Sequence, residues 1–268
     1  MGNTIDEEEA TSQIDSQMEN DAFLIEVVRR GTLLSALKSE PASSSELASR
    51  VDLSRSTIHR ATDSLAERDL IEKSDGTFRL TTYGEVVAEE LIDFRELMAA
   101  IRLLKPFLSY VDVPNFPIED FIDAVVIEPK PRQPHYTVHN IMKLIEETEY
   151  LRAFSSVISP FYVDIARREM LNGMRAEAIF DVETMDIILS EYTEPTEETI
   201  QTGRFDVYVH DEIPFELFIF DEKIGLAAHD ENGIARVLVV SSSPGAINWG
   251  EQLYEEYLAE ARPLHTSS

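Results

Sequence analysis

The sequence lacks cysteine altogether and holds a single tryptophan, Trp249, among its 268 residues. Without thiols the protein can form no disulfide bond and has neither thiolate metal ligands nor a cysteine nucleophile. It also lacks any run of about 18 apolar residues, the length that a membrane-spanning helix requires. Residues 1–20 are acidic and polar, whereas a signal peptide begins with basic and then apolar residues. We therefore expect a cytoplasmic protein with no membrane partner.

Lysine is scarce as well: the chain has 6 lysines beside 17 arginines and 51 acidic residues, and its net charge is −28. Self-repulsion at this charge destabilises a compact fold in dilute salt. In molar salt the Debye length shrinks to about 3 Å, so the repulsion fades while the acidic surface stays hydrated. The composition favours a protein from an extreme halophile, and an ordinary acidic protein is the alternative.

The acidic residues are unevenly distributed along the chain. Between Arg29 and Lys105 there are 12 basic and 13 acidic residues, a net charge of −1, and the rest of the chain carries the remaining −27. A surface that approaches phosphate groups cannot be strongly acidic. This charge-balanced segment is therefore the first candidate for contact with nucleic acid.

Apolar periodicity predicts a helix over residues 21–39, which Pro41 ends. Residues 1–20 show little periodicity and are rich in polar side chains, so we expect a disordered acidic tail there. A short helix up to Arg50 follows the proline. Three adjacent serines are alternative N-caps for it: Ser43, Ser44 and Ser45.

The next predicted helix covers residues 55–68 behind the capping residue Ser54. Its buried face consists of side chains at helical spacing, namely Ile58, Ala61 and Leu65. Two short strands within residues 71–81 surround the turn Ser74-Asp75-Gly76. Helix, helix, tight turn, helix and two-stranded wing is the order of a winged helix-turn-helix, which we assign to residues 21–83.

The third helix of this unit is expected to enter the major groove of double-stranded DNA. Residues that can contact bases or phosphates lie at its start and on its outer side: Ser54, Arg55, Ser56, Thr57, His59 and Arg60. Further phosphate contacts are expected from the short helix and the wing, from Ser44, Ser45, Lys73, Thr77 and Arg79. Asp63 marks the edge of this footprint, because a carboxylate repels phosphate. The alternatives are arginines that only solvate a helix, and a three-helix unit that binds protein.

A long helix is predicted to follow within residues 84–110, and we expect it to link and dimerise the protein. Its apolar residues recur at alternating steps of four and three, the spacing of a coiled coil: Val87, Leu91, Phe94, Met98 and Ile101. A homodimer also suits a small module that reads two half-sites. The alternative is that this face packs on the first helix of the same chain.

Residues 111–138 contain five prolines and are interpreted as a connection between domains. Residues 139–265 then alternate between helical and strand patterns, with a run of strands near the end. We expect helices at about 140–148, 161–174, 183–192 and 246–262, and strands at about 153–159, 175–180, 205–210, 215–220, 224–229 and 236–241. The predicted fold class is α+β, a winged helix-turn-helix joined to an α/β mixed-sheet sensor domain.

Two groups of motifs resemble known families. In the N-terminal half, Gly31-Thr-Leu-Leu-Ser-Ala-Leu, Ser45-Glu-Leu-Ala-Ser-Arg, Ser54-Arg-Ser-Thr-Ile-His-Arg and Leu80-Thr-Thr-Tyr-Gly are similar to winged-helix regulators of archaea, especially haloarchaea. In the C-terminal half, Ser159-Pro-Phe-Tyr, Asp206-Val-Tyr-Val-His-Asp-Glu-Ile-Pro-Phe, Phe220-Asp-Glu-Lys-Ile-Gly-Leu and the helix that carries Trp249 resemble the effector domain of the FilR1-like methanogenesis-regulator family. The resemblance implies a transcription regulator. It does not imply a role in methane formation.

We expect the C-terminal domain to bind a small-molecule effector at the strand ends and at the start of the last helix. The candidate residues are Ser159, Tyr208, His210, His229, Ser242 and Ser243. The serines could hold an anion at the last helix or simply form its N-cap and turn. The histidines and the tyrosine could equally be ordinary surface or core residues.

An enzyme is the alternative class, because the βα pattern with His210 faintly resembles phospholipase-D-like hydrolases. Those enzymes need a lysine two positions after the histidine to neutralise developing phosphoryl charge. Here acidic residues follow both candidate histidines: Asp211 and Glu212 after His210, and Asp230 and Glu231 after His229. We therefore expect no catalytic residue.

His135 and His139 are four residues apart, as metal-binding pairs are, but no third ligand suggests itself. The sequence shows no glycine-rich phosphate loop either. We expect neither a metal nor a cofactor.

Overall fold

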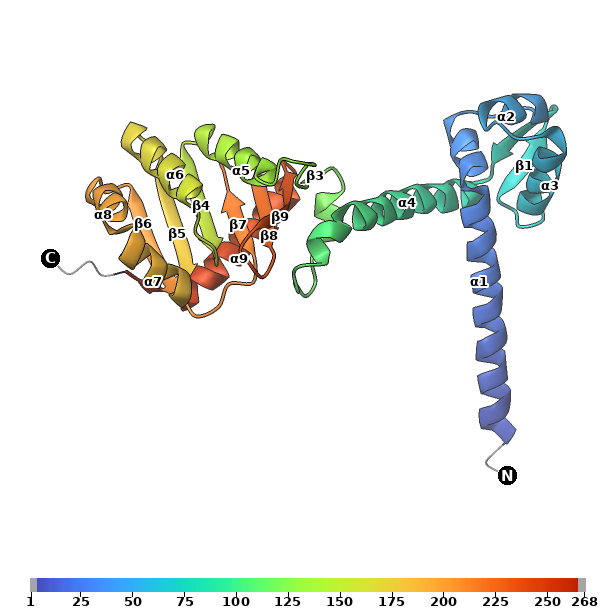
Figure 1. Ribbon diagram of the computed structural model, residues 1–268. Coiled ribbons are helices and arrows are strands. Elements are labelled where there is room, and N and C mark those ends of the chain that lie inside the picture. The colour runs from blue at the N-terminus through green and yellow to red at the C-terminus, as the bar shows by residue number, and fades with distance from the viewer. Residues whose placement is uncertain (1–3, 265–268) are drawn as a thin grey trace. The chain divides into compact units, whose positions relative to one another are not determined.

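The computed structural model describes residues 4–264, with side chains from residue 17 onwards. The chain divides into two compact units, Met1–Glu96 and Leu97–Ser268, which are described one at a time (Figure 1). None of the helices in the described part of the chain combines the length and the apolarity that a membrane crossing requires.

The first unit contains α1 (Thr4–Ser39), α2 (Ser44–Arg50), α3 (Arg55–Ala66), β1 (Ile71–Ser74), β2 (Thr77–Leu80) and the beginning of α4 (Thr82–Leu108). The two strands pair antiparallel, and Asp75 and Gly76 between them have φ values of 52° and 83°. Positive φ at both central residues is the type I′ turn that two-residue hairpins favour. The winged helix-turn-helix predicted from the sequence is confirmed.

Helix α1 begins well before its predicted start. The prediction of a disordered tail over residues 1–20 is wrong for residues 4–20, which are helical, and residues 1–3 lie outside the described range. The sequence from Thr4 to Asn20 contains neither glycine nor proline, so nothing in it ends a helix. The missing apolar periodicity indicated a segment without a buried face, and such a segment can still be helical.

Helices α1, α2 and α3 enclose a core with the wing and the start of α4. Its fully buried side chains include Leu34, Leu47, Ile58, Leu65 and Leu70. The three predicted inward residues of α3 are all buried in it. This core holds α3 by one face and leaves the opposite face to solvent.

The apolar stripe of α4 divides into two parts. Leu91 is buried and Val87 half-buried against the core of the first unit, as the alternative to a coiled coil predicted. Phe94 and Met98 are 45% and 41% exposed, and Ile101 is half-buried. The predicted coiled-coil stripe is therefore not exposed over its whole length. Of its five residues, Phe94 and Met98 are open to a partner.

The second unit is built on a mixed eight-stranded sheet. Its elements after α4 are η1 (Ile118–Phe121), β3 (Val125–Ile127), α5 (Tyr136–Glu146), β4 (Tyr150–Ser155), α6 (Pro160–Asn172), β5 (Arg175–Asp181), α7 (Val182–Glu191), α8 (Thr193–Gln201), β6 (Phe205–His210), β7 (Glu216–Ile219), β8 (Ile224–His229), β9 (Ala235–Ser241), α9 (Pro244–Glu260) and β10 (Arg262–Pro263). The strand order is β10-β6-β5-β4-β7-β8-β9-β3, and β4, β5 and β6 are parallel to one another while the other pairs are antiparallel. The predicted α/β mixed sheet is confirmed.

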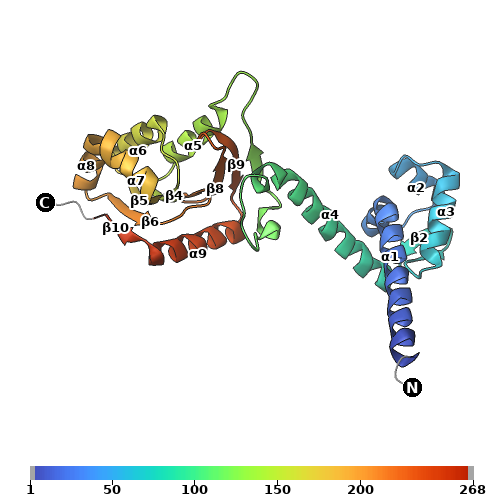
Figure 2. The same cartoon turned by 60° about the horizontal axis from the view of Figure 1, so that its bottom comes forward.

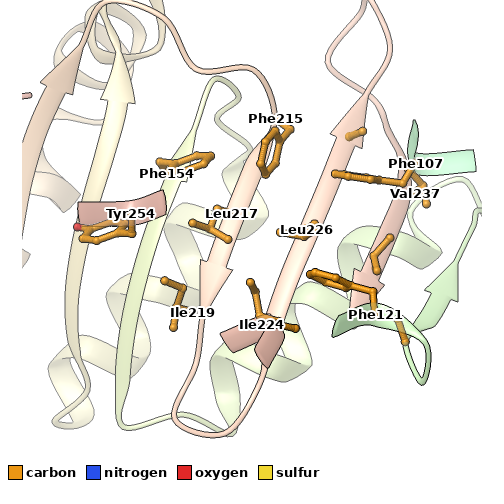
Figure 3. Packing of buried hydrophobic residues seen from close by; sticks show 14 of the residues in the cluster. Phe107, Phe121, Phe154, Phe215, Leu217, Ile219, Ile224, Leu226, Val237 and Tyr254 are labelled. Atoms are coloured by element: carbon orange, nitrogen blue, oxygen red, sulfur yellow. The ribbon is translucent and has the colours of Figure 1, made fainter. Parts of the chain in front are cut away.

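Helices cover both faces of this sheet. Figure 2 shows α9 on one face and α5, α6, α7 and α8 on the other. The α9 face holds a large aromatic and aliphatic core, with Tyr254 of α9 beside Phe154 and Leu217 (Figure 3). Phe107 near the end of α4 and Phe121 of η1 are fully buried in the same core.

The Pro-rich segment 111–138 is more than a connection. It contributes η1 to the core and β3 to the sheet, where Val125, Val126 and Ile127 pair with Val240, Val239 and Leu238 of β9. The sequence prediction also missed α8 and β10. Strand β3 leaves no local signal because its partner β9 is more than 100 residues away. Helix α8 was missed because the threonine and proline in its first turn are typical of a turn.

Candidate nucleic-acid interface and effector cavity

The solvent face of α3 carries the side chains that the sequence predicts for DNA contact. Arg55, Ser56, His59 and Arg60 are all exposed, opposite the buried Ile58 and its neighbours. Among the described residues no ion pair includes Arg55 or Arg60. Two guanidinium groups on one helix side can bind guanine edges or phosphates.

Hydroxyl groups gather at the start of α3. Ser54 is the N-cap, and its Oγ accepts a hydrogen bond from the backbone N–H of Thr57 at 3.2 Å. The same Oγ lies 2.8 Å from Oγ1 of Thr57 and 3.0 Å from Oγ of Ser56. The three hydroxyls thus satisfy one another and the helix start, and a phosphate would have to compete with these bonds.

The start of α2 is less suited to an anion. Ser43 is the N-cap in a capping box with Glu46, which settles the choice among the three serines; Ser44 is half-buried and Ser45 exposed. The backbone N–H of Ser43 donates to the Glu46 carboxylate at 2.7 Å, and this bond, more than the serine hydroxyl, lowers the pKa of Glu46. A carboxylate therefore already occupies the positive end of this helix.

His59 is engaged with its own helix. Its Nδ1 lies 2.6 Å from Oδ2 of Asp63, one turn further on. The pair reduces the freedom of the imidazole to reach DNA. The sequence predicted Asp63 as the edge of the footprint but not this contact.

Of the two basic residues predicted on the wing, Arg79 has an acidic partner among the described residues and Lys73 has none. Arg79 of β2 pairs across the hairpin with Glu72 of β1, with 2.7 Å between Nη2 and Oε1, and Oγ1 of Thr77 donates to the carbonyl of Ser74 at 2.8 Å. Lys73 is exposed, and its ammonium lies over the ring of Phe78 at 5.3 Å from the centroid. Of the three predicted wing residues, Lys73 is the best placed to meet a phosphate.

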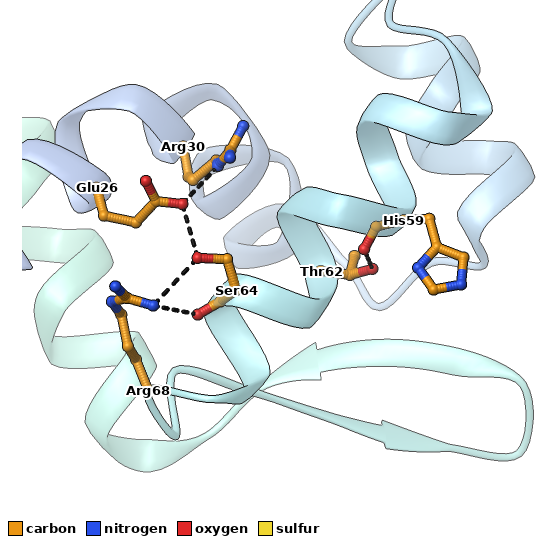
Figure 4. Close-up of polar contacts among 6 residues, drawn as sticks. All are labelled: Glu26, Arg30, His59, Thr62, Ser64 and Arg68. Atoms are coloured by element: carbon orange, nitrogen blue, oxygen red, sulfur yellow. Dashed lines mark hydrogen bonds and ion pairs between the residues drawn. The ribbon is translucent and has the colours of Figure 1, made fainter.

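A partly buried network fixes α3 against α1. Oε1 of Glu26 accepts hydrogen bonds from Nε of Arg30 and from Oγ of Ser64, both at 2.8 Å, and Arg68 donates to the carbonyl and hydroxyl of Ser64 (Figure 4). Partial burial is the largest influence on the pKa of Glu26 and raises it. The bonds from Ser64 and Arg30, with the charges of Arg30 and Arg68, outweigh burial and lower the pKa. The ionised carboxylate holds the helix that carries the exposed arginines.

The six candidate effector residues do not meet in one cavity. Ser159 is the N-cap of α6, with its Oγ accepting from the N–H of Phe161 at 3.3 Å. Tyr208 and His210 lie on the α9 face, where the ring of His210 is 4.9 Å from that of Tyr257. His229 belongs to the other face, in contact with Glu216. These residues therefore do not form a single site, and each stays a separate candidate.

Ser242 and Ser243 lie at the opposite edge of the sheet from His210 and His229. They follow Ser241, which pairs with Ile224 at the start of β8, whereas His229 is at the end of β8. Ser243 is the N-cap residue of α9 without a side-chain bond to the helix. Ser243 thus takes the N-cap position that was the alternative role of these serines, and Ser242 precedes it between β9 and α9.

The structure instead shows a cavity of about 100 Å³ between the sheet and helices α6 and α8. Its wall is mainly aliphatic and aromatic: Ile145, Leu151, Ala153, Val157, Ile158, Val163, Ala166, Met170, Ala178, Phe180, Ile188, Phe205, Val207 and Phe218. Polar and charged residues also line it: Ser155, Tyr162, Arg167, Glu177, Thr196, Thr199 and Glu216. Apolar walls with few polar groups are typical of small-molecule sites.

Glu216 is fully buried, and its carboxylate has two neighbours. Ser155 donates from Oγ to Oε1 at 2.6 Å, and Nε2 of His229 lies 2.9 Å from Oε2, although outside hydrogen-bonding direction. The hydroxyl of Tyr162 is enclosed and has no hydrogen-bond partner among the described residues. Burial, and then the Glu216 charge, raise the pKa of Tyr162, so this phenol keeps its proton.

Sequence analysis missed Glu216, although a signal for it exists. It is the one charged residue in the run Ile213-Pro-Phe-Glu-Leu-Phe-Ile-Phe, within which residues 216–219 form the buried strand β7. A carboxylate in such a strand must be paired or bound, because an isolated buried charge is strongly unfavourable.

No group of three histidine, aspartate or glutamate side chains within the described residues could hold a metal ion. His135 precedes α5, where its ring lies 5.7 Å from that of Phe161, and His139 is within α5. His135, directly after Pro134, and His139 therefore lie on either side of the first residue of α5.

Two family models match the chain. Residues 18–102 match the model described as HVO_A0261 N-terminal domain, and residues 134–260 match methanogenesis regulatory protein FilR1, middle domain. The two ranges coincide with the winged helix and with most of the mixed-sheet unit. The chain is thus similar to the FilR1 middle domain in its mixed-sheet unit and to the HVO_A0261 type in its winged helix, which indicates a transcriptional regulator. This confirms both family resemblances found in the sequence.

Solved structures resemble this chain only distantly. TrmBL2, an archaeal chromatin protein, is 13% identical with a TM-score of 0.44 over 89% of this chain and 94% of its own. Nuc, a phospholipase D family member from Salmonella typhimurium, is 10% identical with a TM-score of 0.43 over 53% of this chain and 99% of its own. The MarR family regulator SPO1453 from Silicibacter pomeroyi is 22% identical with a TM-score of 0.25 over 40% of this chain and 94% of its own. None of the curated proteins matches the chain.

Proposed function

We propose that this regulator binds a specific double-stranded DNA sequence through α3 and responds to a small molecule held by its C-terminal unit, without converting that molecule. The observation that carries the proposal is the exposed side of α3, where Arg55 and Arg60 lie opposite a fully buried face. That side belongs to the charge-balanced segment of a chain whose net charge is −28.

Within this proposal the exposed side chains contribute unequally. Arg55 and Arg60 read bases, because each can donate two hydrogen bonds to a guanine edge. Lys73 on the wing meets a backbone phosphate, and Ser54, Ser56 and Thr57 at the start of α3 do so in exchange for the hydrogen bonds among them. Ser44, Ser45, His59, Thr77 and Arg79 have internal partners or an adjacent carboxylate, so their contributions are smaller.

The test is a binding measurement with the full chain in molar KCl, on an operator selected from random DNA. Arg55→Ala and Arg60→Ala are each expected to cost about 1–3 kcal/mol of binding free energy where the arginine reads a base. The control changes net charge equally: a chain with Arg102→Ala and Arg175→Ala, two exposed arginines outside the winged helix. If the chain with both Arg55→Ala and Arg60→Ala binds the operator as tightly as this control, α3 is not the recognition helix.

The sensor role rests on the cavity between the sheet and α6 and α8. The enzyme alternative is disfavoured because His210 and His229, its two candidate nucleophiles, lie on opposite faces of the sheet. Each is also followed by two acidic residues that repel a phosphodiester. Mass spectrometry of a ligand after prolonged incubation with the protein tests this point, and a stoichiometric excess of product would establish an enzyme.

We propose a homodimer in which α1 and α4 present the interface. Exposed apolar side chains gather on these helices: Leu24, Ile25 and Val28 on α1, and Val86, Phe94 and Met98 on α4. Sedimentation in molar KCl is expected to give a dimer for the unaltered chain and a monomer for Phe94→Glu with Met98→Glu. The control, Val182→Glu with Ile187→Glu, alters two equally exposed apolar residues of α7 and is expected to remain dimeric. A monomeric unaltered chain would refute the dimer.

A further inference from the structure

The cavity between the sheet and α6 and α8 has a polar end with an unused hydrogen-bond donor. Tyr162 of α6 is 9% exposed, yet its hydroxyl has no partner in the described part of the chain. An enclosed hydroxyl without a partner loses its bonds to water and gains none in return. Buried polar groups are nearly always paired, so this one points to a missing partner.

The same end holds an acceptor. Glu216 of β7 lines the cavity and is fully buried, with Oε1 bonded to Ser155 and Oε2 beside Nε2 of His229. The carboxylate thus has a partner on the sheet side, and an oxygen accepts more than one hydrogen bond. A donor and an acceptor therefore line one small and mainly apolar space, in which Arg167 and Glu177 are paired with Glu198 and Tyr150.

We propose that this cavity is the effector site and that it takes a small neutral molecule with a short branched aliphatic body and one hydroxyl group. The assignment rests on the proposed sensor function and specifies its ligand class. A hydroxyl group accepts a hydrogen bond from Tyr162 and donates one to Glu216, so it satisfies both groups at once.

Charge and size exclude the other ligand classes. An anion would lie against the Glu216 carboxylate, where like charges repel strongly, and the arginine of the lining, Arg167, is already paired with Glu198. An ammonium group would have to give up its hydration, and it could donate to Tyr162 but not accept from it. A cavity of about 150 Å³ holds benzene, so a cavity of this size holds about four or five non-hydrogen atoms.

Three probes of one shape test the class: 2-methylpropan-1-ol, 2-methylpropan-1-amine and 2-methylpropanoate. The readout is the methyl resonance of Met170, which lines the cavity and is 2% exposed, in the full chain labelled at methionine in molar KCl. Met98, 41% exposed, reports non-specific effects of the alcohol in the same spectrum. We expect a saturable shift of Met170 with the alcohol, with a Kd of about 0.1–10 mM for so few atoms. The amine should bind at least about tenfold more weakly, and the carboxylate should not bind.

Tyr162→Phe removes the donor and keeps the ring, so it should weaken the alcohol about five- to tenfold. The matched control is Tyr254→Phe, because the hydroxyl of Tyr254 is also buried and unpartnered but lies on the α9 face. This variant should bind the alcohol within about twofold of the unaltered chain. Since the Met170 shift is measured first in the unaltered chain, the test does not depend on a variant that folds.

Three results would overturn the proposal: no saturable Met170 shift with the alcohol, tighter binding of the amine or the carboxylate, or equal losses in Tyr162→Phe and Tyr254→Phe. Operator affinity, measured with and without the alcohol, separates this inference from the sensor function. Alcohol bound at Met170 with unchanged operator affinity supports the ligand class and contradicts the sensor role. Operator release by a host extract without any alcohol binding at Met170 contradicts the ligand class alone.

Discussion

The backbone carbonyl oxygen of Leu70 occupies the space beside Gly84 in which any larger residue would place its Cβ, with only 1.8 Å between the two atoms. The same oxygen accepts a hydrogen bond from the N–H of Thr81 at 3.1 Å, and Oγ1 of Thr81 accepts from the N–H of Gly84 at 2.9 Å. The approach seats the first turn of α4 against the chain that enters the wing. This close approach explains why the motif Leu80-Thr-Thr-Tyr-Gly ends in a glycine.

We expect Gly84→Ala to lower the unfolding free energy of the first unit by about 2–4 kcal/mol, because a backbone atom has to move. Urea unfolding in molar KCl measures the change. Gly31→Ala is the control, since its new Cβ would meet the tip of the Leu91 side chain at 2.9 Å, and a side chain can rotate. Equal losses in the two variants would show that the Leu70 contact is not the cause.

The Glu26 network is expected to give the protein an acid-sensitive contribution to stability. Because the folded-state pKa of Glu26 lies below its ordinary value of 4.5, the contribution is complete above pH 4.5 and is lost as the pH falls through the folded-state pKa. Glu26→Gln should lower the unfolding free energy by about 1–3 kcal/mol at pH 7, since it weakens charge-assisted hydrogen bonds.

Urea unfolding of the unaltered chain and of Glu26→Gln from pH 7 to pH 3.5 tests the direction of this pH dependence. The difference between the unaltered chain and Glu26→Gln should be constant near neutrality and shrink below pH 4.5. A difference that grows in acid would contradict the network as described.

Removing the carboxylate beside His59 should strengthen DNA binding. Asp63→Asn deletes a charge that repels phosphate and frees Nδ1 of His59, so we expect operator affinity to rise about two- to tenfold. Fluorescence anisotropy over a range of KCl concentrations measures it, with Asp186→Asn, an exposed residue of α7, as the charge-matched control. Unchanged affinity would place Asp63 and His59 outside the DNA interface.

The whole chain should gain stability with salt. At a net charge of −28, the thermal unfolding temperature is expected to rise between 0.1 M and molar KCl as repulsion is screened. Scanning calorimetry measures it, with sucrose at equal osmolality as a control for solvent exclusion. An unfolding temperature independent of KCl would contradict the proposed halophilic adaptation.

The features predicted best from the sequence are helix caps and turns, which residues adjacent in the chain determine. Ser43 and Ser54 cap helices whose first turns lie beside them, and Asp75-Gly76 forms a turn whose type depends on two residues. Strand β3 was missed because its partner is β9, more than 100 residues later. Only the folded sheet supplies the reason for that strand to form.

The two candidate sites differ in how far the sequence predicts them, and for the same reason. The exposed side of α3 follows from helical spacing within one element, so Arg55 and Arg60 could be named in advance. The effector cavity combines Ser155, Tyr162 and Glu216 from β4, α6 and β7, and no spacing rule joins them. His210 and His229 were predicted for their place at strand ends, whereas the proposed cavity includes Glu216, a glutamate inside an apolar strand.

Strand β3 also bears on how regulators of this type can be recombined. It covers the edge of β9, and Phe121 and Phe107 from the residues before it are fully buried in the core of the second unit. A chimera that takes only residues 134–260, the span of the middle-domain match, would leave a bare strand edge and an open core. The exchangeable cassette begins at Leu97, inside α4, so a working hybrid has to be spliced within a continuous helix.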